Sequence, residues 1–183
     1  IGNGVTTIGD YAFYSCNSLT SVTIGNSVTT IGVCAFEQCT SLTSVTIGKG
    51  VTSFGSDVFT GCTGELIINS NIPSVSSPEY SPFYNSKFTK VTIGNSVTTI
   101  GDYAFYECSS LTSVTIGNSV TTIGYAAFAY CESLTSVTIG KGVTTIGAGV
   151  FAGCKGELII NSNIPNVSGL NSGPFYNSKF TKV

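Results

Sequence analysis

Residues 18–40 read SLTSVTIGNSVTTIGVCAFEQCT, and this stretch decides the fold because it holds three local signals in a fixed order. The first signal is an alternation of apolar and hydroxyl side chains. Val22 and Ile24 alternate with Ser21 and Thr23, a period of two that is typical of a strand with one buried face. We therefore expect a strand whose Val and Ile point inward and whose hydroxyls face solvent.

The rest of this stretch predicts a turn, a second strand and a compact closing segment. The pair at 25–26, Gly-Asn, supplies turn chemistry. A shorter VTTI segment then buries Val28 and Ile31, and Gly32 ends it. The closing segment AFEQC, at 35–39, is predicted to form one helical or 3₁₀ turn.

The same cadence runs through the whole chain. Residues 1–91 align without a gap on 93–183, and 71 of these 91 pairs are identical. Within each unit, one strand isoleucine recurs at steps of 23, 23, 21 and 25 residues, at Ile1, Ile24, Ile47, Ile68 and Ile93. Such periods indicate a solenoid. We predict a single domain over 1–183, built from two tandem units (1–92 and 93–183) of four turns each, hence about eight turns of about 23 residues.

Stacking turns 4.7–4.9 Å apart converts each inward position into a ladder along the molecule. No single turn can bury these residues alone, but stacked turns form one continuous core. The sequence predicts a phenylalanine spine of Phe13, Phe36, Phe59, Phe83, Phe105, Phe128, Phe151 and Phe175. It predicts a second ladder of Ile8, Ile31, Phe54, Val75, Ile100, Ile123, Ile146 and Val167.

Six of the seven cysteines lie three residues after a spine phenylalanine: Cys16, Cys39, Cys62, Cys108, Cys131 and Cys154. A buried free cysteine behaves as a small apolar residue, so this ladder indicates core packing with free thiols rather than disulfides or a metal site. Cys34 occupies a different slot and could be exposed.

Composition excludes several functions. The chain is 42% hydrophobic but only 9% charged, and it has a net charge of -2 with no His. The scattered lysines form no basic stripe for nucleic acid, and no apolar run is long enough to insert in a membrane. Without His, and with carboxylates spread along the chain, neither a catalytic site nor a metal or cofactor site is expected.

The regular turn, closed by Phe-x-x-Cys in six instances, resembles the BspA-type leucine-rich repeat of bacterial surface proteins, a family also expanded in some parasitic protists. The irregular fourth turn, GELIINSNIP followed by PFYNSKFTKV, resembles a recurring variant of that family. The resemblance covers essentially the whole chain. It implies a right-handed leucine-rich-repeat β-solenoid, a secreted or cell-surface location, and adhesion to host or neighbouring-cell proteins.

The 20 differences between the two units indicate where a partner would bind, because variable positions of a solenoid often mark its binding face. Six of them fall at 74–81, and most others flank the spine. Tyrosine is enriched in protein interfaces, so the candidate contacts for an extracellular protein ligand are Pro78, Glu79, Tyr80, Tyr11, Tyr14, Tyr103, Tyr106, Tyr125 and Tyr130. The alternative is that these tyrosines only cover the edge of the core.

Both ends of the chain have the sequence of interior turns, so we expect a longer array or head-to-tail self-association. Two function classes follow. The solenoid is either an adhesion module or a structural spacer or fibre subunit of an extracellular assembly.

Overall fold

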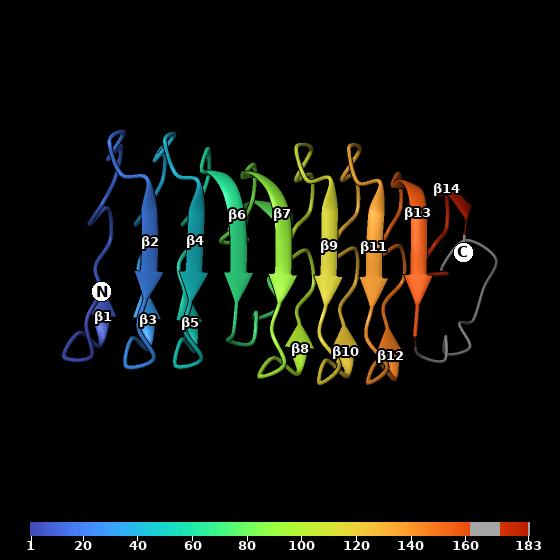
Figure 1. Cartoon of the computed structure of the whole chain (residues 1–183), viewed down its shortest axis with the longest axis horizontal. Coiled ribbons are helices and arrows are strands. Elements are labelled where there is room, and N and C mark those ends of the chain that lie inside the picture. Colours follow the sequence, from blue (N-terminus) through green and yellow to red (C-terminus); the bar gives the residue numbers. More distant parts are fainter. Residues whose placement is uncertain (162–172, 183) are drawn as a thin grey trace.

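The computed structural model describes residues 1–161 and 173–182, and they form a parallel β-solenoid (Figure 1). Its main sheet has eight parallel strands, so the chain makes about seven turns between the first strand and the last. In spatial order these strands are β2 (Ser21–Ile24), β4 (Ser44–Ile47), β6 (Thr63–Ile68), β7 (Lys87–Ile93), β9 (Ser113–Ile116), β11 (Ser136–Ile139), β13 (Lys155–Ile160) and β14 (Lys179–Lys182).

Two smaller sheets of three short strands each form a second side of the solenoid. The first consists of β1 (Thr7–Ile8), β3 (Thr30–Ile31) and β5 (Ser53–Phe54), and the second of β8 (Thr99–Ile100), β10 (Thr122–Ile123) and β12 (Thr145–Ile146). The two sheets are separated by the fourth turn, which contributes only an isolated bridge between Ile72 and Ile100.

The alternation in the main strands has the predicted orientation. Val22 pairs with Val45, and Thr23 pairs with Thr46. Both valines are buried, whereas Thr23 is exposed and Thr46 half-buried. Each strand of sequence SVTI therefore places its Val and Ile in the core and its hydroxyls outside, as the period of two requires.

The prediction of the second ladder, which begins at Ile8, is correct in the regular turns but wrong in the fourth turn. Ile72, which is 1% exposed, takes this position and bridges to Ile100, whereas Val75 is only half-buried. The reason is that the chain reaches this side four residues after Ile68 instead of seven, and the surplus residues then form an outward loop. That loop contains the 3₁₀ helix η1 (Pro78–Tyr80). Val167, assigned to the same ladder, lies outside the described residues.

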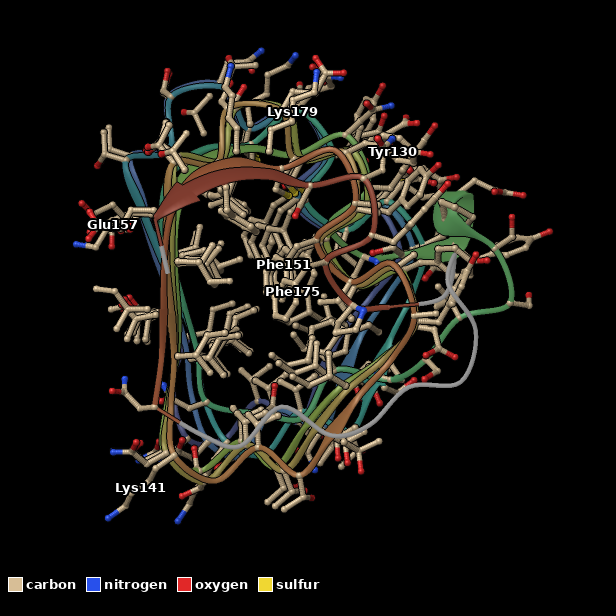
Figure 2. The ribbon with its side chains drawn as sticks, turned by 90° about the vertical axis from the view of Figure 1, so that its right-hand side faces the viewer. Tyr130, Lys141, Phe151, Glu157, Phe175 and Lys179 are labelled. Carbon is tan, nitrogen blue, oxygen red and sulfur yellow. The ribbon has the colours of Figure 1, made fainter. Side chains whose placement is uncertain are left out.

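The phenylalanine spine is confirmed. Successive rings are stacked, with centroids 4.8–5.7 Å apart and planes within 16° of parallel. The six inner rings are fully buried, and Phe13 and Phe175 are partly buried. Figure 2, which looks along the solenoid, shows Phe151 and Phe175 one behind the other in the interior.

The segments that carry the spine are not helical, so the predicted helical or 3₁₀ turn is wrong. We call the segment that joins each small-sheet position to the next main strand an arc. In the second arc, alternate amides at Cys34, Phe36 and Gln38 donate to carbonyls of the following turn. Cys34 and Gln38 also adopt left-handed φ angles of 53° and 60°, which an α-helix excludes. Pairing with the next turn thus alternates with isolated local turns, in which Glu37 donates to Cys34 and Cys39 to Phe36, and takes the place of a continuous helix.

The cysteines are all free thiols, as predicted. In the ladder, the Sγ of a cysteine donates to the carbonyl of the spine phenylalanine one turn earlier. Cys62 Sγ lies 2.9 Å from the Phe36 oxygen, and Cys131 Sγ lies 3.2 Å from the Phe105 oxygen. The thiols therefore link successive turns without covalent bonds.

Cys34, by contrast, does not have the exposure suggested by its sequence position. Its side chain is only 8% exposed, because Tyr11 and Glu37 lie against the thiol. Burial raises the pKa of Cys34 to about 11.

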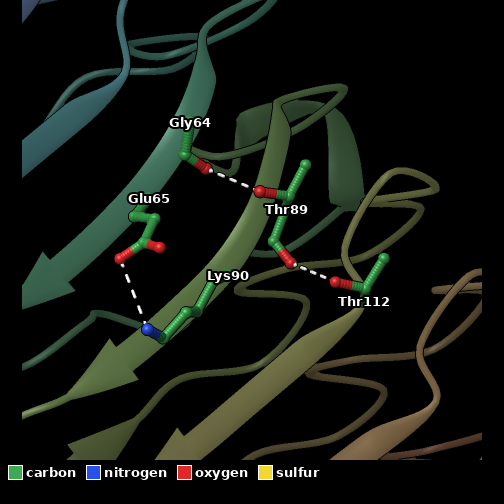
Figure 3. A network of polar contacts seen from close by, with 5 residues as sticks. All are labelled: Gly64, Glu65, Thr89, Lys90 and Thr112. Atoms are coloured by element: carbon green, nitrogen blue, oxygen red, sulfur yellow. Dashed lines mark hydrogen bonds and ion pairs between the residues drawn. The ribbon is translucent and has the colours of Figure 1, made fainter.

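Polar side chains also tie the turns together on the outside (Figure 3). The Thr112 hydroxyl donates to the Thr89 carbonyl at 2.8 Å, and the Thr89 hydroxyl donates to the Gly64 carbonyl at 3.3 Å. Beside them, Lys90 and Glu65 form an ion pair at 3.4 Å across β6 and β7. The exposed threonines thus stabilise the stack of turns.

Candidate functional site

A groove runs over the arcs of the last four turns. It is about 390 Å³ in volume and is lined by Pro78, Tyr103, Tyr106, Tyr125, Ala126, Ala129, Tyr130, Ala148, Gly149, Ala152 and Tyr176. Figure 2 shows Tyr130 on the side of the solenoid opposite Glu157, which belongs to the main sheet. The groove therefore lies on the arc side, away from the hydroxyl-covered face.

Four of the tyrosines form a connected set of edge-to-face contacts. Tyr103 contacts Tyr106 at 5.8 Å and Tyr125 at 5.3 Å, and Tyr106 contacts Tyr130 at 5.4 Å between ring centroids. Edge-to-face pairs at these distances are favourable and hold the rings in place. Tyr125 and Tyr130 are nevertheless 50% and 44% exposed, so the set presents ordered aromatic surface to solvent.

Two of these tyrosines occupy strained backbone positions. Tyr103 and Tyr130 have φ angles of 57° and 59°, in the left-handed region. Gly153 takes the position of Tyr130 one turn later, and Gly149 takes that of Tyr103 two turns later. A side chain costs on the order of 1 kcal/mol there, and glycine avoids that cost. The same left-handed φ recurs in every described arc, including arcs away from the groove, so it is a property of the fold.

The groove coincides with the differences between the two units. Ten of its eleven lining residues belong to the second unit, and seven of those ten differ from their counterparts in the first. In the second unit all seven are Tyr, Ala or Gly. The first unit has Val33, Cys34, Glu37, Gln38, Ser56, Asp57 and Thr60 instead. Two aromatic walls and a shallow floor thus arise on a frame that is otherwise almost unchanged.

None of the described lining residues carries a charged side chain. Partial burial raises the pKa of the Tyr103 and Tyr106 hydroxyls above its ordinary value. Both therefore remain protonated, and able to donate a hydrogen bond, at neutral pH. The hydroxyls of these two tyrosines donate to no other described residue. The site consequently offers apolar rings and hydrogen-bond donors without net charge.

Five of the nine candidate contact residues predicted from the sequence lie together in the structure. Pro78, Tyr103, Tyr106, Tyr125 and Tyr130 all line the groove. This tests their position only, so their role in binding stays a prediction.

The other four predicted residues lie elsewhere. Tyr11 and Tyr14 contact each other at 5.9 Å in the first turn and do not line the groove. Glu79 and Tyr80 are exposed on η1 but do not line the groove. The hydrogen bond from the Ser77 hydroxyl lowers the pKa of the Glu79 carboxyl, so Glu79 is ionised near neutral pH.

Sequence reasoning missed the groove floor and Tyr176. Ala126, Ala129, Ala148 and Ala152 attract no attention as single residues. They were nevertheless among the differences between the two units, and that signal could have located them.

Other kinds of site are not found in the described part of the chain. Within residues 1–161 and 173–182, no cluster of three or more Cys, Asp or Glu side chains could hold a metal ion. The same residues include no helix long and apolar enough to cross a membrane.

Comparison with known proteins identifies the family. The sequence profile of the BspA type leucine rich repeat region matches residues 1–81 and 76–183, with six copies of the repeat. The chain belongs to this family. No curated protein matches it.

Solved leucine-rich-repeat structures share the fold. A leucine-rich repeat protein from Bacteroides ovatus is 25% identical, with a TM-score of 0.68, over 100% of this chain and 47% of that one. A leucine rich cell surface protein from Faecalibacterium prausnitzii is 31% identical, with a TM-score of 0.58, over 92% and 48%. The T. pallidum leucine rich repeat protein is 28% identical, with a TM-score of 0.56, over 82% and 70%. The chain thus spans about half the length of two of these proteins.

Proposed function

We propose that this chain is a non-catalytic interaction module, secreted or held at a cell surface, that binds an extracellular protein of a host or neighbouring cell through the tyrosine-lined groove. One observation carries the proposal: seven differences between nearly identical units converge on one surface and give it the composition of a protein interface. The family and the cell-surface description of the F. prausnitzii protein support the location.

The chemistry of the groove supports a binding role over a catalytic one. Among the residues that the structure describes, its lining contains no cysteine, serine, lysine or carboxylate that could act as nucleophile or general base. The chain also contains no histidine. What the groove offers is contact area from tyrosines, which bind at low entropic cost.

The test uses variants taken from the chain's own first unit. Tyr125→Val together with Tyr130→Gln restores the residues found at 33 and 38, and Gln38 already has a left-handed φ of 60°. The frame should therefore tolerate both changes. Biolayer interferometry against a panel of immobilised extracellular proteins should give at least one partner whose binding falls tenfold or more in this variant.

The matched control removes two tyrosines away from the groove, as Tyr11→Ala with Tyr14→Ala. Binding of the same partner should remain within twofold of the unchanged chain. If every bound partner is retained equally by both double variants, the groove is not the binding site.

A second candidate function is that of a structural spacer or fibre subunit that stacks head to tail. The observation in its favour is the junction between the two units, which has the same kinds of contact as the junction between any other two successive turns. Phe83 of the first unit stacks on Phe105 of the second at 4.8 Å, and β7 pairs in register with β9. The surfaces of one unit are therefore suited to stack on another.

Sedimentation velocity over a range of concentrations tests this alternative. Stacking predicts a weight-average mass that rises with concentration, and electron microscopy should then show filaments. A constant monomer mass at high concentration would contradict it.

A further inference from the structure

We propose that the groove takes a proline-rich segment of its protein partner in the polyproline II conformation. This inference rests on the proposed function, because it names the chemistry of the partner at the same site. It follows from four properties of the groove: the lack of charge in its described lining, its hydroxyl donors, its length and its shape.

The uncharged lining indicates a partner segment without charge at the point of contact. Every described lining residue is Tyr, Ala, Gly or Pro. Glycan recognition generally needs carboxylates, which accept from sugar hydroxyls, or amide side chains, which both donate to them and accept from them. Asp, Glu, Asn and Gln are absent from the described part of the lining. A proline ring, in contrast, requires only an aromatic or apolar surface.

The tyrosine hydroxyls need acceptors, and a polyproline II segment supplies them. Tyr103 and Tyr106 donate to no other described residue, and both keep their protons at neutral pH because partial burial raises their pKa. A polyproline II segment has no internal hydrogen bonds, so its carbonyls are free to accept. The backbone carbonyls of an α-helix are already bonded within the helix.

The length of the groove fits such a segment. The groove crosses four successive arcs, from Tyr103 to Tyr176, and adjacent turns lie about 4.8 Å apart. Three intervals give about 14 Å, which a polyproline II chain, rising about 3.1 Å per residue, covers with about five residues.

The shape of the groove disfavours the other modes of peptide recognition. The floor is formed by Ala126, Ala129, Ala148, Gly149 and Ala152, and the walls by tyrosine rings. No unpaired strand edge lies among these residues for a β-strand to join. Docking of a proline-rich segment between aromatic rings is a recurring mode that exploits a partner already ordered before binding.

The experiment measures binding of fluorescein-labelled decaproline to the whole chain by fluorescence anisotropy. We expect saturable binding that weakens at least tenfold in Tyr125→Val with Tyr130→Gln and stays within twofold in Tyr11→Ala with Tyr14→Ala. A third variant fills the floor with first-unit residues, as Ala129→Glu, Gly149→Asp and Ala152→Thr. It should also lose at least tenfold, although all the tyrosines remain.

Circular dichroism of each variant shows whether it is folded, and a decaglycine peptide of the same length serves as the probe control. Equal binding of decaproline and decaglycine, or of decaproline by all variants, would overturn the inference. So would binding of a neutral oligosaccharide in place of decaproline. If decaproline does not bind while a protein partner still depends on Tyr125 and Tyr130, the inference fails and the proposed function stands. If no partner depends on them either, both fail.

Discussion

Truncation of Phe128 to alanine should remove a large part of the cohesion of the solenoid. Phe128 is fully buried. Its ring stacks on Phe105 at 5.1 Å and on Phe151 at 5.5 Å. Replacement of a buried Phe by Ala costs about 3–5 kcal/mol, which includes the cavity left behind. Because both stacking partners lose a contact, we expect a loss of about 4 kcal/mol.

The loss can be measured by urea denaturation, followed by far-UV circular dichroism and by tyrosine fluorescence. Phe128→Leu is the matched control, since it keeps much of the buried volume and should lose less. Repeat proteins are stabilised by contacts between neighbouring turns, so a lower m-value would show that the two sides of the cavity unfold separately. A loss below about 1 kcal/mol for Phe128→Ala would refute the role of the spine, because it would mean that the neighbouring turns close the gap.

Three further outcomes are expected. Gly149 has a φ of 61°, and Ala126, at the equivalent position one turn earlier, has a φ of 50°. Gly149→Ala should therefore destabilise the protein by about 0.5–1 kcal/mol, and Ala126→Gly should stabilise it by a similar amount. If urea denaturation gave both changes the same sign, backbone strain at this position would be contradicted. Burial raises the pKa of both Cys62 and Cys108 to about 12. At pH 8.5 a maleimide should therefore label the half-buried Cys16 faster than these two thiols, and it should label all seven thiols only after denaturation. Because the unfolded thiols ionise near pH 9 while these two stay protonated, the free energy of unfolding should fall as the pH rises from about 9 towards 12; a melting temperature unchanged between pH 8 and 10.5 would argue against this. The Lys90–Glu65 pair is half exposed on both sides, so Lys90→Ala should change the free energy of unfolding by no more than about 1 kcal/mol, and a larger, salt-dependent loss would show that the pair is a structural anchor.

The sequence was informative wherever a local pattern sets the structure. The alternation from Ser21 to Ile24 was sufficient to orient the main strand, because a period of two has one meaning on a sheet. The recurrence of the spine phenylalanines was sufficient to stack the turns. Both features follow from the chain's own periodicity.

Local patterns failed where contacts with the next turn decide the conformation. Ala35, Phe36 and Cys39 have a spacing compatible with a short helix, but alternate amides of this segment, including that of Phe36, donate to the following turn. The sequence of this segment alone does not reveal that pairing. The same holds for Ile72 and Val75, since residue counting cannot show where an irregular turn places its surplus residues.

The groove was predicted only in part from the sequence. Its tyrosine walls were predicted, because aromatic residues at variable positions are informative one by one. Its floor was not, because an alanine matters there only through the side chain it lacks. The structure was needed to show that substitutions such as Glu37 to Ala129 and Thr60 to Ala152 share one surface.

The direction of the hydrogen bonds between turns has a mechanical consequence. In Figure 1 the turns follow one another along the long axis, and the ladder bonds of the main sheet point along that axis. The thiol contacts between turns are not covalent. Tension along the axis would therefore load each interface between turns in series, and the solenoid would peel apart one turn at a time at low force. A chain that is anchored at one end and pulled at the other would unfold gradually, and it would dissipate work each time a turn separates from the stack.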